Sequence, residues 1–174
     1  RVLVRECVLA GYTKIHLDAS MRCADDPAGL PLEKAVAAER AAVLCQAAEE
    51  ATGSLDSDRQ RPLYVIGTEV PTPGGVLSYG DPPAVTAVED VRETLDLTRE
   101  AFLRHGLEEA WERVIAVVVQ PGVEFGDDSL FPYDCGAAAP LAQFIENEER
   151  LVFEAHSTDY QTCAALRAMV EDHF

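Results

Sequence analysis

The stretch Val114-Ile115-Ala116-Val117-Val118-Val119 decides the fold class of this chain of 174 residues. The run is β-branched almost throughout and has no polar residue on either face. A strand with one side in water would alternate polar and apolar residues, so this run does not fit such a strand. Continuous apolar runs of this kind are typical of parallel strands covered by helices on both faces. The run therefore predicts an α/β protein with residues 114–119 as a buried strand.

Segments on both sides of this run alternate between strand-like and helix-like patterns. Strands are predicted at residues 13–18, 63–67 and 151–156, and helices at 2–10, 31–52, 86–105, 107–112, 140–149 and from 158 onward. In helix 31–52, the residues expected to form the buried stripe are Val36, Val43, Leu44 and Ala47. Alternating strands and helices form parallel sheets through right-handed crossovers. A doubly wound sheet and a (β/α)8 barrel both fit, although no G-x-G-x-x-G follows the first strand, which disfavours a dinucleotide-binding fold.

The length limits how much of a barrel the chain can form. A complete barrel needs about 250 residues, and four strands are half of the usual set. The first residue is Arg1, and residues 1–10 include charged side chains, so they lack the apolar core of a signal peptide. The last residues have the pattern of a helix interior. We therefore expect residues 1–174 to be a single partial barrel domain, truncated at both ends and internal to a longer protein.

Composition excludes some classes of partner. The formal net charge is −17, and nucleic acids and anionic membranes both select basic surfaces. No apolar run approaches the roughly 18 residues of a membrane span. The five cysteines are odd in number and contain no C-x-x-C pair, which favours reduced thiols in the cytoplasm over disulfides or a zinc ribbon.

The carboxyl ends of the predicted strands carry most of the reactive side chains. In parallel α/β folds, catalytic and ligand-binding residues are concentrated at these ends. The residues found there are His16, Asp18, Glu69, Gln120, Glu124, Glu154, His156 and Asp159. Imidazoles and carboxylates could bind a divalent metal that polarises a sugar carbonyl or stabilises an enediolate, while another carboxylate moves the proton. The structural alternative is that Asp18 and Asp159 cap a loop turn and a helix.

Four motifs at these positions resemble the GatZ/KbaZ-like family. They are KIHLDASM (14–21), GTEVP (67–71), AWERVIAVVVQPGVEF (110–125) and LVFEAHSTDYQT (151–162). The resemblance implies a TIM-type (β/α)8 barrel, of which four parallel βα units, about half, would be present. It also implies an accessory, non-catalytic subunit of class II D-tagatose-1,6-bisphosphate aldolase in galactitol or N-acetylgalactosamine catabolism. The implied partner is the zinc-dependent aldolase catalytic subunit, whose activity and stability the family supports.

The same resemblance leaves an enzymatic alternative open, because some family members are metal-dependent ketohexose 4-epimerases that interconvert fructose and tagatose. In this alternative a divalent metal (zinc, manganese or nickel) binds a sugar or sugar phosphate together with the strand-end side chains. The expected metal ligands are Glu69, Glu124 and His156, the expected catalytic residues are Asp18 and Glu69, and the expected substrate-binding residues are His16, Gln120 and Asp159.

A more distant similarity bears on the aldolase reaction itself. Class II aldolases carry a strand-end His-x-Asp-His, in which the Asp transfers a proton and the second His binds zinc. His16-Leu17-Asp18 matches this motif, but Ala19 occupies the position of the zinc ligand. An alanine has no lone pair to offer a metal, so the resemblance argues against independent aldolase activity.

Overall fold

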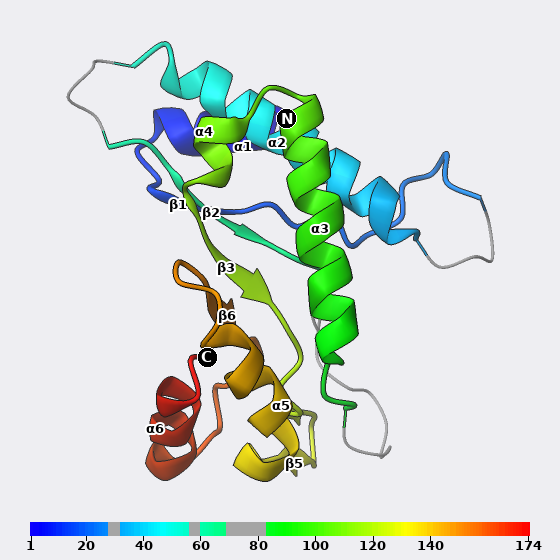
Figure 1. Ribbon diagram of the computed structural model, residues 1–174, viewed down its shortest axis with the longest axis vertical. Helices are drawn as coiled ribbons and strands as arrows, with labels where there is room; N and C mark the ends of the chain where they lie inside the picture. Colours follow the sequence, from blue (N-terminus) through cyan, green and yellow to red (C-terminus); the bar gives the residue numbers. More distant parts are fainter. Residues whose placement is uncertain (28–31, 56–59, 69–82) are drawn as a thin grey trace. The chain divides into compact units, whose positions relative to one another are not determined.

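The computed structural model describes residues 1–27, 32–55, 60–68 and 83–174 (Figure 1). The elements in chain order are α1 (Val2–Leu9), β1 (Lys14–His16), α2 (Lys34–Thr52), β2 (Leu63–Ile66), α3 (Val88–Arg104), α4 (Glu108–Trp111), β3 (Val114–Val118), β4 (Glu124–Phe125), β5 (Leu130–Phe131), α5 (Cys135–Ile145), β6 (Val152–Glu154) and α6 (Cys163–Glu171). Four strands form one sheet in the order β1-β2-β3-β6. The α/β class is confirmed.

The apolar run forms β3, and its neighbour is parallel as expected. Ala116 is paired with Val152 of β6, and Val118 is paired with Glu154. Every residue of β3 except Ile115 is buried. The ladder continues beyond the strand, because the Val119 amide donates to the Glu154 carbonyl at 3.2 Å. The carboxyl ends of β3 and β6 therefore lie at the same edge of the sheet.

The chain divides into two compact units, the first formed by Arg1–Thr68 and Glu93–Ile115. In this unit β1 and β2 pair in parallel, and α1 lies beside α2 (Figure 1). The predicted stripe of α2 is wrong, because its buried residues are Ala37, Ala38, Ala41, Ala42, Cys45, Ala48 and Ala51. Small side chains on the inner face let a helix approach its neighbours closely, and this packing outweighs the hydrophobicity of the larger residues.

A polar network joins α2 to the beginnings of two strands in the first unit. The Tyr64 side chain is 0% exposed, and its hydroxyl donates to a carboxylate oxygen of Glu49. Arg113 donates to the other Glu49 oxygen at 2.5 Å and to the Pro62 carbonyl at 2.7 Å. Its guanidinium also lies 5.4 Å from the centre of the Tyr64 ring. Burial raises the pKa of the Tyr64 hydroxyl, so Tyr64 remains a neutral donor to Glu49.

The second unit comprises Glu69–Arg92 and Ala116–Phe174, and it contains two departures from the predicted elements. The antiparallel hairpin of β4 and β5 was not expected. Helix α5 begins at Cys135 instead of residue 140, because the Asp134 carboxylate accepts hydrogen bonds from the amides of Gly136 and Ala137. An Asp at this position satisfies amides that the first turn leaves unpaired. Pro140 therefore lies inside the helix.

Helix α6 also begins later than predicted, at Cys163 instead of residue 158. The Thr162 hydroxyl accepts from the Ala165 amide and caps the helix. The preceding residues form a loop that is fixed by Gln161. This buried side chain accepts from the Tyr133 amide at 2.9 Å and donates to the Phe131 carbonyl at 3.0 Å. The loop after β6 is thereby tied to the segment between β5 and α5.

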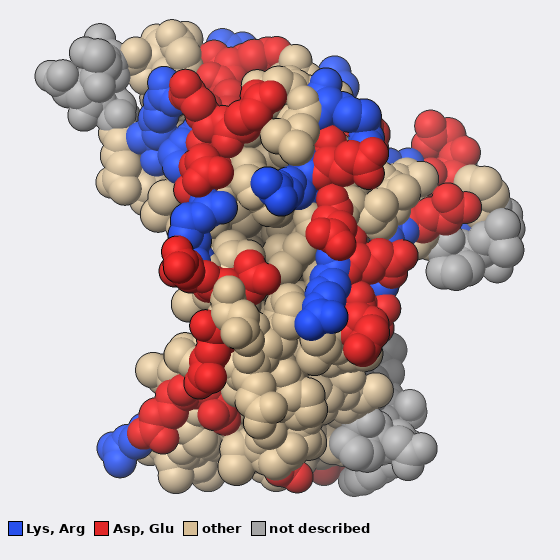
Figure 2. Space-filling model, in the orientation of Figure 1, with Lys and Arg blue, Asp and Glu red and all other residues tan. Residues whose placement is uncertain are grey.

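Charged side chains are mixed on the face of the described residues drawn in Figure 2. Lys and Arg lie among Asp and Glu there and form no separate basic patch. Helix α5 contributes no charge, since Cys135–Ile145 contains neither acidic nor basic residues. Within the described residues no helix is both long enough and apolar enough to cross a membrane. All five cysteines are free thiols.

We expect the Glu49 network to contribute measurably to stability. Tyr64→Phe removes one donor from a carboxylate that keeps its guanidinium partner, so it should lower the free energy of unfolding by about 1–2 kcal/mol. Arg113→Met leaves the half-buried carboxylate without its cation and should cost about 3 kcal/mol. Urea unfolding of each variant measures both values.

The matched control is the Arg61–Glu109 pair, whose side chains are 55% and 84% exposed. Arg61→Ala should change the unfolding free energy by less than about 0.5 kcal/mol, because water screens exposed pairs. An Arg113→Met variant as stable as Arg61→Ala would contradict the structural role of the network.

Candidate functional site

The end of β1 presents alternate side chains to opposite faces of the sheet, as the sequence predicted. Ile15 and Leu17 are buried, whereas Lys14 is exposed and His16 is half-buried. The His16 Nε2 atom lies 3.3 Å from the carbonyl oxygen of Gly67, just beyond the end of β2. The structure thus gives one of the predicted substrate-binding residues a defined backbone partner.

The loop after β1 is built around two aspartates. Asp18 is exposed, and its Oδ1 accepts from the Ser20 amide at 2.8 Å, as in the structural alternative of a loop turn. Asp26 accepts from both terminal nitrogens of Arg40, at 2.6 and 2.9 Å. The hydrogen bonds from Arg40 and from the Cys23 amide lower the pKa of Asp26 from 3.8 to about 2. The Asp26–Arg40 pair therefore anchors the loop that carries Asp18 to α2.

Gln120 follows β3, and its hydrogen bonds are local. Its backbone amide donates to the Thr86 hydroxyl at 2.8 Å, and its side-chain oxygen accepts from the Gly122 backbone amide at 2.8 Å. Gly122 has a positive φ of 90°. These contacts fix the turn after β3, so the geometry gives Gln120 a structural task beside its predicted substrate-binding role.

Glu124 lies in β4 and is only 3% exposed. One of its carboxylate oxygens accepts from the Phe125 amide at 3.0 Å. A buried carboxylate requires hydrogen bonds or a cation to offset its lost hydration. A carboxylate is the type of group predicted as a metal ligand here, and the Phe125 amide is the partner that the structure gives it.

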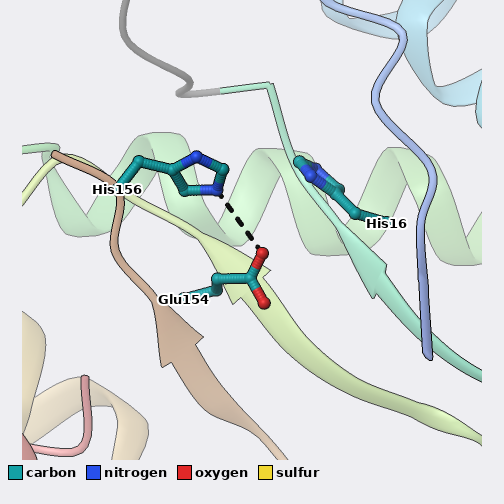
Figure 3. Close-up of side chains that lie close together, drawn as sticks. All are labelled: His16, Glu154 and His156. Atoms are coloured by element: carbon teal, nitrogen blue, oxygen red, sulfur yellow. Dashed lines mark ion pairs between the residues drawn. The ribbon is translucent and has the colours of Figure 1, made fainter.

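The end of β6 brings a carboxylate and an imidazole together. The Glu154 Oε1 and His156 Nε2 atoms are 3.4 Å apart, the contact marked in Figure 3. Ser157, the next residue, has a positive φ of 57°, a conformation that side chains other than Gly adopt infrequently. Asp159 is exposed in the loop that follows. The chain therefore turns sharply directly after His156.

The donor types at the end of β6 suit a divalent transition metal. Zinc accepts imidazole nitrogen and carboxylate oxygen, and manganese and nickel also bind such ligands. Glu154 supplies the carboxylate and His156 the imidazole. Glu154 was among the predicted strand-end residues but was not predicted as a metal ligand. Its spacing of two residues from His156, which places both side chains on the same face of the strand, is the sequence signal that indicates this pair. The predicted ligand and catalytic residue Glu69 lies outside the described residues.

Comparison with known families gives one match over the full chain. The family described as "D-tagatose-1,6-bisphosphate aldolase subunit GatZ/KbaZ-like" matches residues 1–174. The match includes all four motifs on which the resemblance rested.

Curated relatives and a solved structure agree with this match. The D-tagatose-1,6-bisphosphate aldolase subunit GatZ of Escherichia coli K12 is 55% identical over 172 residues, which are 99% of this chain and 40% of the relative. The subunit of the same name from E. coli SMS-3-5 is 54% identical with the same coverage. A crystal structure from Sinorhizobium meliloti 1021, described as "a probable tagatose 6 phosphate kinase", is 42% identical with a TM-score of 0.80, and the match covers 98% of this chain and 38% of that one. The chain thus spans about two fifths of the length of these proteins.

The Asp26–Arg40 pair predicts a specific pH dependence. Because the pKa of Asp26 is lowered to about 2 on folding, the pair stabilises the fold above the usual pKa of 3.8. This contribution is lost as the pH falls from about 4 to about 2. In Asp26→Asn the thermal midpoint should be lower than that of the wild type at pH 5, and should fall less between pH 4 and pH 2.

The matched control is Asp25→Asn, which removes the same charge from the same loop and leaves the pair with Arg40 in place. It should keep the wild-type dependence on pH in this range. An Asp26→Asn variant whose midpoint falls as steeply as that of the wild type would show that the pair does not contribute.

Proposed function

Because this chain belongs to the D-tagatose-1,6-bisphosphate aldolase subunit GatZ/KbaZ-like family, we propose that it acts as part of an accessory subunit. In this proposal it binds and stabilises the catalytic subunit of a class II aldolase in the cytoplasm, in galactitol or N-acetylgalactosamine catabolism. The supporting observation is the family match over residues 1–174. Relatives that are 54–55% identical carry the same subunit name.

The residue at position 19 supports an accessory role over independent aldolase activity. Ala19 stands where the class II aldolases carry a zinc-binding histidine, and it is only 9% exposed. A methyl group cannot bind a metal, and its burial leaves little room for an imidazole without movement of the loop. Asp18 remains at the position of the aldolase proton-transfer residue, so a sugar site could persist without the aldolase zinc.

A kinase reaction has less support. The sequence contains no G-x-x-x-x-G-K-[ST] loop, whose backbone amides and lysine hold nucleotide phosphates in one large class of phosphotransferases. The kinase description belongs to the Sinorhizobium protein, and no motif of this chain adds to it.

The accessory role predicts activation of a partner. Adding the protein to a purified class II tagatose-bisphosphate aldolase catalytic subunit should raise its rate of D-tagatose 1,6-bisphosphate cleavage and its thermal midpoint. The protein alone should show no cleavage. Size-exclusion chromatography with light scattering and a coupled assay for the triose phosphates measure these effects. A catalytic subunit that is neither bound nor activated would overturn the accessory role.

The Glu154–His156 pair favours a second candidate, a divalent-metal-dependent ketohexose 4-epimerase. In this candidate Glu69, Glu124 and His156 bind the metal, and Glu154 contributes to the site. The bound metal would polarise a sugar oxygen and so increase the acidity of neighbouring positions. Asp18 would transfer the proton, while His16, Gln120 and Asp159 would hold the sugar or sugar phosphate.

The epimerase candidate predicts metal binding that depends on the end of β6. His156→Ala and Glu154→Gln should weaken Mn²⁺ binding at least about tenfold, as removal of a ligand or its immediate partner does. Isothermal titration calorimetry on the metal-stripped protein measures this. The matched control is Glu146→Gln, which alters the exposed partner of His173 in a second His–Glu pair with a separation of 3.8 Å.

A fructose–tagatose interconversion assay then separates the two candidates. Metal-dependent epimerisation that is lost in His156→Ala but retained in Glu146→Gln would support an enzyme. Absence of metal-dependent turnover, together with activation of the aldolase catalytic subunit, would overturn the epimerase and leave the accessory role.

A further inference from the structure

The first unit contains a small cavity between α2, α3 and the residues that follow β1 and β2. Its volume is about 20 Å³, which is enough for one water molecule. The cavity is lined from α2 by Ala37, Ala38 and Ala41, from α3 by Thr94 and Thr98, and beyond β2 by Thr68. All of these residues belong to the first compact unit, so the cavity is defined by that unit alone.

The alanine face of α2 is the reason for this space. Ala37, Ala38 and Ala41 are buried, and each side chain is a single methyl group. Methyl groups let α2 pack closely, but they do not fill the space opposite a helix that also carries short side chains. Thr94 and Thr98 stand four residues apart and therefore on the same face of α3. Short side chains thus meet from both helices, and the space between them stays open.

Thr98 is a polar residue that the fold buries without giving it a partner. It is 3% exposed, and its hydroxyl forms no hydrogen bond with any group in the part of the chain that the structure describes. Thr52 of α2 shows the usual alternative, because its hydroxyl donates to the Ala48 carbonyl one turn earlier at 2.9 Å. Burial of a hydroxyl without a hydrogen bond is unfavourable. Thr98 therefore requires a partner that the cavity can hold.

The walls of the cavity suit a small neutral ligand. A buried water makes about three hydrogen bonds, and Thr68, Thr94 and Thr98 each contribute a side chain that can donate and accept. An anion is disfavoured, although Lys34 also lines the cavity. The ammonium of Lys34 is paired with the Glu93 carboxylate at 2.7 Å, and this carboxylate would repel an anion.

We propose that the cavity binds one structural water molecule, which the hydroxyls of Thr98, Thr94 and Thr68 hold and which joins α3 to the end of β2. The water completes the hydrogen bonding of Thr98 and occupies the space that the alanines of α2 leave. This inference goes beyond the proposed function, because it requires neither a sugar, a metal nor a partner subunit. Only hydrogen bonds form, and no covalent bond changes.

A crystal structure of the protein at a resolution that shows ordered water tests the site directly. The cavity should contain one water molecule, with its oxygen about 3 Å from the hydroxyl oxygens of Thr98 and Thr68. An empty cavity would overturn the proposal. A Thr98 hydroxyl that donates to the Thr94 carbonyl, in the manner of Thr52, would overturn it as well.

Two substitutions separate the hydroxyl of Thr98 from its shape. Thr98→Val replaces the hydroxyl by a methyl group of similar size, so crystals of this variant should lack the ordered water. Thr98→Ser keeps the hydroxyl and removes the methyl group, so the water should remain. A water that stays in place in Thr98→Val, or one that is absent from both the wild type and Thr98→Ser, would contradict the role of the Thr98 hydroxyl.

Amide hydrogen exchange measures what the water stabilises. In Thr98→Val the amides of Gly67 and Thr68 should exchange at least about tenfold faster, because the end of β2 opens more readily without its link to α3. The Tyr64 amide, which donates to the Arg113 carbonyl at 2.9 Å, should keep its exchange rate. Equal acceleration at Tyr64, or no acceleration at Gly67 and Thr68, would overturn the link between α3 and β2.

The matched control is Thr52→Val, which makes the same change of atoms at a hydroxyl that already has a carbonyl partner. It should retain the water and the wild-type exchange rates of Gly67 and Thr68, and loss of the water here would show that the effect of Thr98→Val is not specific. These results are independent of the tests of the proposed function. Failure to activate an aldolase subunit would leave the water in place, and an empty cavity would leave the accessory role intact.

Discussion

The parallel pairing of β3, a strand that is apolar on both faces, is the constraint on which the rest of the structure depends. Such a strand must be covered on each side, and the crossover helices of parallel βα units provide that cover. The interior of a strand covered in this way has no room for polar chemistry. Reactive side chains are then expected where the strands end, and His16, Glu154 and His156 all occupy such positions. The apolar pattern of β3 thus directs the search for a site to the ends of the strands.

The same constraint explains which elements could be predicted from the sequence. The run that forms β3 is apolar on both faces, which is a distinctive pattern, whereas β1 and β6 alternate exposed and buried residues. All four strands of the parallel sheet lie within their predicted ranges. Each strand of the β4–β5 hairpin has two residues, too few for an alternation of polar and apolar residues to be detected in the sequence. The start of α5 depends on a cap by Asp134, and the buried face of α2 depends on alanines. Capping and close packing are decided by tertiary contacts, which a hydrophobicity pattern does not contain.

The candidate site was predictable in its residue types and only partly in its interactions. The expectation that reactive residues lie at the carboxyl ends of strands identifies His16, Asp18 and His156, and the spacing of two residues relates Glu154 to His156. The sequence pattern cannot show that Asp18 accepts a hydrogen bond from the Ser20 amide, or that Gln120 accepts one from the Gly122 amide. One partner of His16 is a main-chain carbonyl, which every residue possesses. Only the backbone conformation at Gly67, with its positive φ, indicates why this carbonyl faces the imidazole.

The pair at the end of β6 has the electrostatic character of a cation site. Glu154 brings a carboxylate to within 3.4 Å of the His156 imidazole, and a carboxylate beside an imidazole supplies the donor types that a divalent transition metal accepts. At the end of β1, by contrast, the buried methyl group of Ala19 offers no ligand atom. If the chain binds a metal, the end of β6 is therefore a better place for it than position 19, where the class II aldolases carry a zinc-binding histidine.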